Sequence, residues 1–191
     1  HPDELLADTD VDVVYLATPT GLHGAMGRLI IHAGKHLWCE KPMTTSYEET
    51  LDLVNAARTA SLVGLEADMF IHHPQFTKLR SIVRAGECGR LVSMTARFGF
   101  PHRGGDDFRY SRALGGGALL DAGFYPGAAA VSLMDPGLQL AGSTMVSAAE
   151  IEVDTGGTAL VVAASRGAVL DWGFGRSYRS EISVWCEGAV V

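Results

Sequence analysis

The sequence predicts two regions of different fold class. Residues 1–70 form an α/β region that represents half of a doubly wound parallel sheet, and residues 71–191 form an α+β region with an open, mainly antiparallel sheet. Short apolar runs alternate with helical periodicity in the first region. Alternating strands separated by short glycine turns dominate the second region. The pattern of predicted strands and helices changes at about Pro74, and no long linker separates the two regions.

The first region follows a strand–helix order with short connections. The apolar run at 11–17 predicts a buried parallel strand, and 36–39 and 62–67 predict a second and a third strand. Helical spacing predicts a helix over 22–33, and Ser46 with Glu49 forms a capping box that opens a second helix. Parallel strands joined by right-handed crossovers place their functional loops at their carboxyl ends. The residues after the first and second strands are therefore the ones to examine for function.

The second region begins with a predicted helix over 76–86 and a strand over 92–98. A polar loop spans about 100–114, and the glycine run at 115–117 opens a helix that reaches about residue 134. Four consecutive strands follow, at 138–148, 158–164, 168–174 and 180–186. Their short turns favour antiparallel hairpins.

Composition and charge exclude several classes of function. The 191 residues are 47% hydrophobic with a formal net charge of −7, so we expect a globular protein that does not bind nucleic acid. The apolar runs are too short to cross a membrane, and no signal peptide is evident. Three cysteines without a Cys-x-x-Cys motif favour reduced thiols and a cytoplasmic location, with Cys39 in the core.

Lys41 and Tyr125 are the candidate catalytic residues. Lys41 follows a predicted parallel strand, and Pro42 restricts its backbone. Tyr125 and Asp121 are four residues apart after the glycine run, which places them on one face of a continuous helix. An ammonium group beside a substrate oxygen and a phenol that donates a proton would serve carbonyl reduction. An exposed loop lysine and a half-buried core tyrosine are the alternatives.

Several cationic side chains are candidates for binding an anionic substrate. Arg103 and Arg109 belong to the polar loop before the glycine run. Tyr178 and Arg179 belong to a predicted hairpin. Guanidinium groups suit phosphate recognition. A solvated surface loop explains these arginines at least as well.

The histidines do not predict a metal site. His32 and His36 are separated by the end of a predicted helix, and the adjacent His72 and His73 lack a third ligand. His23 begins the first long helix, where it either touches a cofactor or is simply exposed.

With these residues placed, the chain resembles the Gfo/Idh/MocA oxidoreductases, and within them the nucleotide-sugar 3-ketoreductases. The resemblance runs almost from end to end. It rests on VDVVYLATPTGLH at 11–23, GKHLWCEKP at 34–42, MFIHHPQF at 69–76 and GGGALLDAGFYP at 115–126, with a weaker match in YRSEISVW at 178–185.

The resemblance implies a Rossmann domain that binds NADP or NAD, followed by a domain whose sheet packs against another subunit in a homodimer or homotetramer. It implies that Lys41 orients the substrate and touches the nicotinamide ribose, that Tyr125 donates the proton, and that Asp121 lines the substrate pocket. The residues implied to border the cofactor are Thr18, Pro19, His23, Glu40 and Lys41.

Many family members have histidine at the position of Tyr125, and tyrosine is the variant of the ketoreductase and dihydrodiol-dehydrogenase branches. The resemblance therefore favours NAD(P)H-dependent reduction of a keto-sugar, and of a nucleotide-linked keto-sugar in particular. Lys41 and Tyr125 would have to converge on one carbonyl group for this activity.

One expected part is absent from the sequence. Family members begin with a strand, a glycine-rich phosphate loop and a helix, and no such loop precedes the strand at 11–17. We expect the first sheet to have an unpaired apolar edge as a result. Two alternatives stay open: a non-catalytic sugar-binding or oligomerisation module, and a diol or sugar dehydrogenase of the same family.

Overall fold

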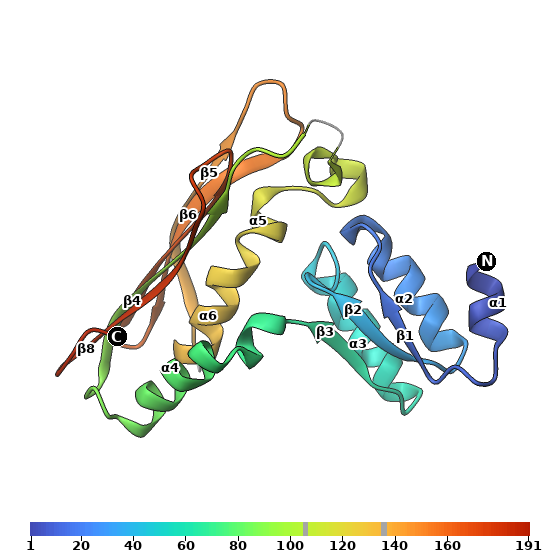
Figure 1. Ribbon diagram of the computed structural model, residues 1–191, viewed down its shortest axis with the longest axis horizontal. Helices are drawn as coiled ribbons and strands as arrows, with labels where there is room; N and C mark the ends of the chain where they lie inside the picture. The colour runs from blue at the N-terminus through green and yellow to red at the C-terminus, as the bar shows by residue number, and fades with distance from the viewer. Residues whose placement is uncertain (105–106, 135–136) are drawn as a thin grey trace. The chain divides into compact units, whose positions relative to one another are not determined.

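The computed structural model describes residues 1–104, 107–134 and 137–191, and these divide into two compact units (Figure 1). Unit 1 comprises His1–Asp68 and Ser111–Gly116, and unit 2 comprises Met69–Tyr110 and Gly117–Val191. Each unit has its own hydrophobic core. The predicted boundary at residue 70 is a single cut, whereas the structure assigns the short segment 111–116 to the first unit.

Unit 1 is built on a three-stranded parallel sheet, here called sheet A, in the order β1–β2–β3. The predicted parallel α/β arrangement is thereby confirmed. Ser46 caps α3 as expected, since its Oγ accepts a hydrogen bond of 3.2 Å from Glu49 N. The elements of unit 1 are α1 (Pro2–Ala7), β1 (Val13–Leu16), η1 (Thr20–Leu22), α2 (His23–His32), β2 (His36–Glu40), α3 (Tyr47–Thr59), β3 (Gly64–Ala67) and η4 (Arg112–Leu114).

The two faces of sheet A differ because alternate side chains of a strand point to opposite sides. Leu16, Leu37 and Cys39 are buried in the core that includes residues of α2 and α3. Tyr15 and Trp38 belong to the other set and are about half exposed, with ring centroids 5.1 Å apart. Within the described residues β1 pairs with β2 alone, so its second edge has no strand beside it.

Unit 2 is built on a five-stranded sheet, here called sheet B, in the order β5–β6–β7–β4–β8. β4 and β7 are parallel and the other pairs are antiparallel, as expected for a mainly antiparallel sheet. The hairpin predicted around Tyr178 and Arg179 is wrong, because β4 lies between β7 and β8 in the sheet. Helices lie along one face of sheet B, and Figure 1 shows no described helix on the other. The elements are η2 (Met69–His72), α4 (Pro74–Ala85), β4 (Leu91–Phe100), η3 (Phe108–Tyr110), α5 (Ala118–Asp121), α6 (Phe124–Met134), β5 (Gln139–Ser147), β6 (Asp154–Ala163), β7 (Arg166–Phe174) and β8 (Arg179–Cys186).

The single helix predicted from the glycine run to residue 134 is in fact two helices, α5 and α6. The break occurs because Gly123 N donates to Ala118 O, five residues back, at 2.8 Å. Asp121 ends α5 and Tyr125 lies in α6, so the predicted shared face of one continuous helix is wrong. The two side chains enter different local environments.

The expectation of three reduced thiols is also wrong, because Cys88 and Cys186 form a disulfide. The start of β4 and the end of β8 are neighbours in an antiparallel pair, which brings the two Cα atoms to 5.6 Å although 98 residues separate them in sequence. Cys39 is free and fully buried, as predicted for a core residue. Burial raises the pKa of the Cys39 thiol to about 12, and the nearby Glu66 and Glu40 add to this rise.

Asp154, at the start of β6, fixes the beginning of α5. Its Oδ2 accepts a hydrogen bond of 2.8 Å from Leu119 N, one of the amide groups that a helix leaves without an internal partner. The chain reaches this position through Gly117, which has a φ of 121° and where a Cβ would lie 2.5 Å from Asp154 Oδ1. Burial raises the pKa of Asp154 and outweighs the hydrogen bonds that lower it.

We therefore expect Asp154 to make the free energy of unfolding depend on pH. A carboxyl group whose pKa is raised by folding stabilises the protein below its ordinary value of 3.8, and this contribution is lost as pH rises through the raised pKa. Asp154→Asn keeps an acceptor for Leu119 N and should flatten this part of the pH profile. Asp154→Ala removes the acceptor as well and should be about 1 kcal/mol less stable than Asp154→Asn at any pH, because neither variant titrates at this position. Urea unfolding at several pH values measures both effects, and an unchanged profile in Asp154→Asn would contradict the assignment.

Candidate functional site

In unit 1 the predicted site residues gather at the carboxyl edge of sheet A. Thr18 and Pro19 follow β1, Glu40 ends β2, and Lys41 comes directly after it. Because β1 and β2 are adjacent parallel strands, their carboxyl ends lie at the same edge of the sheet. All four residues are partly exposed. This is the edge at which open parallel sheets bind their ligands.

Lys41 stands in a turn that hydrogen bonds hold from several sides. Its backbone N donates to its neighbour Glu40 at Oε2, over 3.3 Å. Glu66 of β3 accepts a hydrogen bond of 2.5 Å from Met43 N. Burial raises the pKa of Glu66, while the Met43 N–H and the charges of Lys41 and His23 oppose the rise. The contact between Glu66 and Met43 was not predicted, because 23 residues separate them and no local pattern joins them.

Glu40 also accepts a hydrogen bond from the hydroxyl of Tyr15, a residue of β1. This bond raises the pKa of Tyr15, with smaller contributions in the same direction from burial and from the charge of Glu40. Glu40 thus links the ends of β1 and β2 and contacts the amide of Lys41. Its expected place beside a cofactor stays a prediction.

His23 is buried, and its ring is occupied by the protein itself. Its side chain is 1% exposed, and its two ring nitrogens face the carbonyl oxygens of Thr18 and Pro42 at 2.8 and 3.0 Å. The expectation of an exposed first-turn histidine is therefore wrong. A direct contact with a cofactor would need an accessible polar atom, and both polar atoms of this ring already have partners.

Segment 111–116 packs against the same part of unit 1. Gly115 has a φ of 74°, and a Cβ on it would overlap the backbone nitrogen of Gly21 in η1. A Cβ on Gly21 would in turn lie 2.8 Å from Ala113 O. The close approach that the glycine run permits is thus made, at Gly115, to the backbone of the chain itself.

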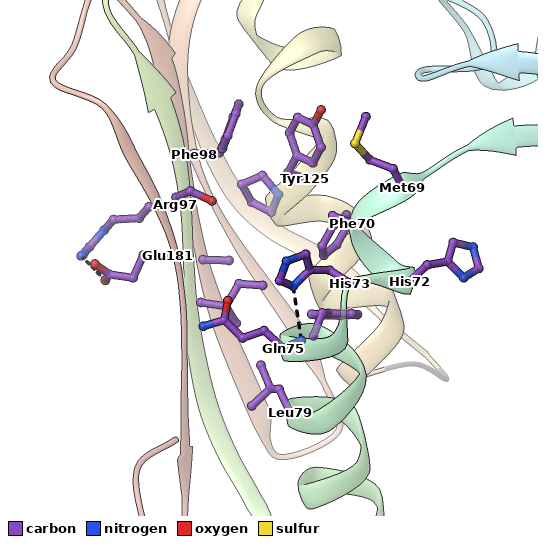
Figure 2. A pocket seen from close by; sticks show the side chains of 15 residues that line it. Met69, Phe70, His72, His73, Gln75, Leu79, Arg97, Phe98, Tyr125 and Glu181 are labelled. Carbon is purple, nitrogen blue, oxygen red and sulfur yellow. Dashed lines mark hydrogen bonds and ion pairs between the residues drawn. The ribbon is translucent and has the colours of Figure 1, made fainter.

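In unit 2, Tyr125 lines a cavity of about 560 Å³ between sheet B and the helices (Figure 2). Its ring packs 4.5 Å from the ring of Phe98 and 5.9 Å from that of Phe70, measured between centroids. Tyr125 itself is only partly buried. Aromatic walls of this kind restrict the orientation of a phenol ring.

The polar groups of this cavity come from the segment between β3 and α4 and from the end of sheet B. His73 caps α4 by accepting from Gln75 N at 3.3 Å, and both line the cavity together with His72 (Figure 2). Arg97 and Glu181 contribute to the wall, but their side chains point away from it and pair with each other. The sequence pattern of the two histidines was interpreted only in terms of metal binding, so their place in the wall of the cavity was not predicted.

Asp121 is held by Arg109, another predicted substrate residue. Arg109 Nε donates to Asp121 Oδ2 at 2.6 Å, and Arg109 Nη1 donates to Asp107 Oδ1 at 3.0 Å. The three side chains are about one-fifth exposed. Burial lowers the pKa of Arg109, but the two carboxylates outweigh it and raise the pKa overall. Arg109 thus serves to fix Asp121, and its guanidinium is already engaged by two carboxylates.

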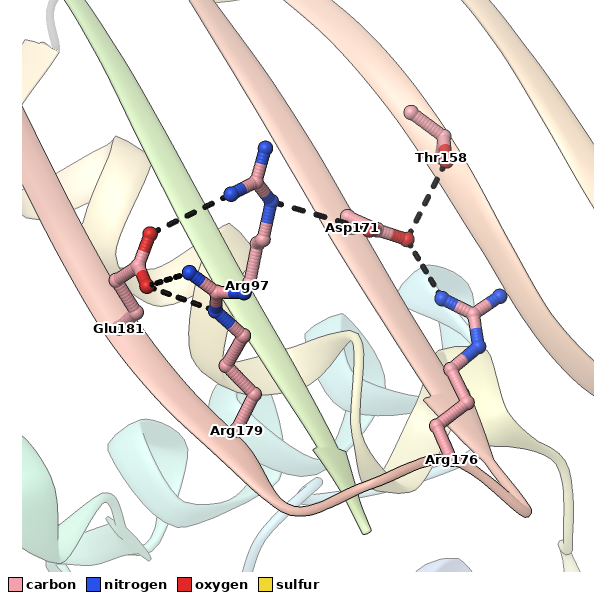
Figure 3. A network of polar contacts seen from close by, with 6 residues as sticks. All are labelled: Arg97, Thr158, Asp171, Arg176, Arg179 and Glu181. Carbon is pink, nitrogen blue, oxygen red and sulfur yellow. Dashed lines mark hydrogen bonds and ion pairs between the residues drawn. The ribbon is translucent and has the colours of Figure 1, made fainter.

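The remaining predicted substrate residues do not line the Tyr125 cavity. Arg103 N donates to Tyr110 Oη, and its guanidinium lies over the ring of Phe100. Arg179 pairs with Glu181 through its Nε at 2.7 Å (Figure 3). Tyr178 is 70% exposed, with its ring centroid 6.4 Å from that of Phe98. Their roles toward a substrate stay predictions.

The described residues contain neither a metal-binding cluster nor a membrane-spanning helix. No group of three or more histidine, cysteine, aspartate or glutamate side chains in that part of the chain is arranged to hold a metal ion. No helix in the described ranges combines the length and the apolar character needed to cross a membrane.

Comparison with known proteins agrees with this architecture. Residues 1–67 match the model of an oxidoreductase family with an NAD-binding Rossmann fold, and residues 76–190 match the GFO/IDH/MocA C-terminal domain. The chain belongs to the Gfo/Idh/MocA oxidoreductase family. The two matched segments leave out residues 68–75, which include η2 of unit 2, and residue 191.

Among the family's curated members, two similar proteins are dTDP-3,4-didehydro-2,6-dideoxy-alpha-D-glucose 3-reductases. The enzyme of Saccharopolyspora spinosa is 39% identical over 95% of this chain and 55% of its own length. That of Streptomyces violaceoruber is 40% identical over 83% of this chain and 46% of its own length. The chain thus spans about half the length of these relatives.

A similar solved structure is that of KijD10, a 3-ketoreductase from Actinomadura kijaniata, in complex with NADP and TDP-benzene. It superimposes with a TM-score of 0.92 at 33% identity, over 97% of this chain and 57% of KijD10. The fold predicted from sequence is confirmed by this likeness.

The ion pairs of Arg109 lead to a prediction about the stability of the protein. Arg109→Gln should lower the free energy of unfolding by about 1–3 kcal/mol, because Asp107 and Asp121 then lose the cation between them. Arg109→Lys keeps the charge but cannot bond both carboxylates through a planar fork, so an intermediate loss is expected. Arg84, exposed in the last turn of α4, is the matched control, and Arg84→Gln should change stability by less than about 0.5 kcal/mol. Equal losses at both sites would contradict this role of Arg109.

Proposed function

We propose that the chain takes part in NAD(P)H-dependent reduction of a keto-sugar linked to a nucleotide. The observation that carries the proposal is the cavity of unit 2, where aromatic rings hold the phenol of Tyr125. The named relatives support the substrate class, because they are 3-reductases of a dTDP-linked didehydro sugar. KijD10 in complex with NADP and TDP-benzene supports the cofactor and the nucleotide.

The residues at the carboxyl edge of sheet A fit the nicotinamide end of a dinucleotide. Thr18 Oγ1 is buried and has no hydrogen-bond partner among the described residues, which leaves a polar atom for a bound group or water to satisfy. Pro19 and Lys41 lie beside it at the ends of β1 and β2. These residues would border the cofactor, as the family resemblance implies for Thr18, Pro19, Glu40 and Lys41.

When bound, the reduced nicotinamide supplies a hydride to the carbonyl carbon. Tyr125 Oη gives its proton to the carbonyl oxygen, which becomes the product hydroxyl. Lys41 presents its ammonium group to that oxygen and stabilises the negative charge that develops on it. The aromatic wall around Tyr125 restricts water near the phenol, which strengthens these electrostatic interactions.

The role of Tyr125 is tested by Tyr125→Phe. We expect kcat to fall by about 100-fold or more, because a positioned acid contributes 100- to 10,000-fold. The Kd for NADPH should change little, since phenylalanine preserves the aromatic packing. Turnover is followed by loss of nicotinamide absorbance with a nucleotide-linked keto-sugar, and the Kd by nicotinamide fluorescence. Tyr47→Phe, at a tyrosine that is 74% exposed on α3, is the matched control.

Unchanged turnover in Tyr125→Phe would remove Tyr125 from this role. Binding of the sugar nucleotide by the wild-type protein without binding of NADPH would favour the sugar-binding module instead. Turnover only in the oxidative direction, with NAD(P)⁺ and a free sugar or diol, would favour the dehydrogenase alternative.

We further propose that the protein forms a homodimer or homotetramer through the helix-free face of sheet B. Leu160 and Val169 are paired on neighbouring strands of this face and are 45% and 38% exposed. Beside them lies a network of three arginines and two carboxylates, drawn with Thr158 in Figure 3. Mixed charges around apolar side chains suit a surface that packs against a second copy of itself.

Leu160→Asp is expected to convert the assembly to monomers, because a carboxylate would be buried without a partner in each copy of the interface. Sedimentation velocity measures the mass of the particle. Leu29→Asp, at a leucine that is 57% exposed on α2, is the control and should leave the assembly intact. A wild-type monomer at micromolar concentration would overturn the proposed assembly.

A further inference from the structure

His23 joins the two loops that leave β1 and β2. It is the first residue of α2, yet it is 1% exposed. Its Nε2 lies 2.8 Å from Thr18 O, and its Nδ1 lies 3.0 Å from Pro42 O. One buried ring therefore connects the strand end that carries Thr18 to the turn that carries Lys41.

Both atoms that face the ring are carbonyl oxygens, which only accept hydrogen bonds. Each ring nitrogen needs its own hydrogen to bond its partner, and a histidine with two N–H groups is the positively charged imidazolium. A neutral ring would direct a lone pair at one of the oxygens, so that contact would set two acceptors against each other instead of forming a hydrogen bond.

Glu66 acts on the other side of the same peptide group. Pro42 O accepts from His23, and Met43 N, in the same peptide group, donates to Glu66 Oε1 at 2.5 Å. A donor at the oxygen and an acceptor at the nitrogen polarise the peptide in the same direction, so the two hydrogen bonds strengthen each other. The opposite charges of His23 and Glu66 match the direction of the peptide dipole.

We propose that His23 is a positioning residue which, as an imidazolium, holds the Pro42–Met43 peptide group together with Glu66 and thereby fixes the turn of Lys41. The part of this inference that concerns catalysis rests on the proposed function, since Lys41 is assigned to the substrate there. The part that concerns the ring and the peptide group rests on the hydrogen bonds alone.

The state of the ring can be measured without turnover. In isotope-labelled wild-type protein at neutral pH, NMR is expected to show two ring N–H protons for His23, assigned by through-bond correlation of the ring with the backbone resonances of the same residue. A single ring N–H in the wild type overturns the inference. This measurement does not require that any variant fold.

The effect of His23 on the turn is measured by the rate of hydrogen exchange at the amide of Met43. His23→Phe should speed this exchange by about tenfold or more, because the peptide group loses its donor. His23→Gln should speed it less, since an amide nitrogen carries two donors. His32→Phe, at an exposed histidine on the same helix, is the control and should change nothing. An unchanged Met43 rate in both His23 variants overturns the inference, and His23→Gln decides alone if His23→Phe does not fold.

Turnover then separates this inference from the proposed function. His23→Phe should lower kcat about tenfold or more, with KM for NADPH nearly unchanged. The double variant His23→Phe with Lys41→Met should have the same kcat as Lys41→Met alone, because both substitutions act through one ammonium group. If the wild type does not oxidise NADPH while the NMR results are as expected, the proposed function fails and the hold on the turn is supported. If Lys41→Met abolishes turnover while His23→Phe keeps kcat and the Met43 rate, this inference fails alone.

Discussion

Hydrogen bonding of loop backbone to buried polar side chains is the constraint on which the carboxyl edge of sheet A depends. Three polar or charged residues are buried in the described part of the chain, Thr20, His23 and Thr44, and all belong to loops or to the helix start at this edge. A buried polar group is costly unless it is hydrogen bonded. The loops at this edge of sheet A are therefore held by hydrogen bonds to buried side chains. The strands are held by the backbone hydrogen bonds between them.

The two candidate catalytic groups are fixed by different physical means. The turn of Lys41 is held through backbone hydrogen bonds to side chains of α2 and β3. Tyr125 is held by ring packing against Phe98 and Phe70, from β4 and η2. Hydrogen bonds fix a direction, whereas ring contacts fix a volume and exclude water. The ammonium group of lysine is carried on a flexible side chain, so its position depends on a fixed backbone. The rigid phenol ring of tyrosine is positioned by the side chains that pack against it.

Local patterns were sufficient for the strands of both sheets and for the start of α3, because these depend on periodicity and capping within a few residues. The position of Lys41 at a strand end followed from the parallel order alone. The break at Gly123, the disulfide of Cys88 with Cys186 and the bond from Met43 to Glu66 were not predicted. Each of the last two joins residues far apart in sequence, which no local pattern can show. The break coincides with a single hydrogen bond, from Gly123 N to Ala118 O five residues earlier, which the sequence pattern does not indicate.

The contrast between His23 and Arg109 shows why residue type alone does not identify a binding residue. Both were predicted to contact a ligand, and both have polar atoms engaged by the protein: His23 by two carbonyl oxygens, Arg109 by two carboxylates. A polar atom that already has a partner must lose it before it can bind a ligand, so its net gain from binding is small. Thr18 Oγ1 lacks such a partner among the described residues, although a threonine is a weaker sequence signal than either. Unused hydrogen-bonding capacity is therefore a better criterion for choosing a candidate binding residue than charge alone.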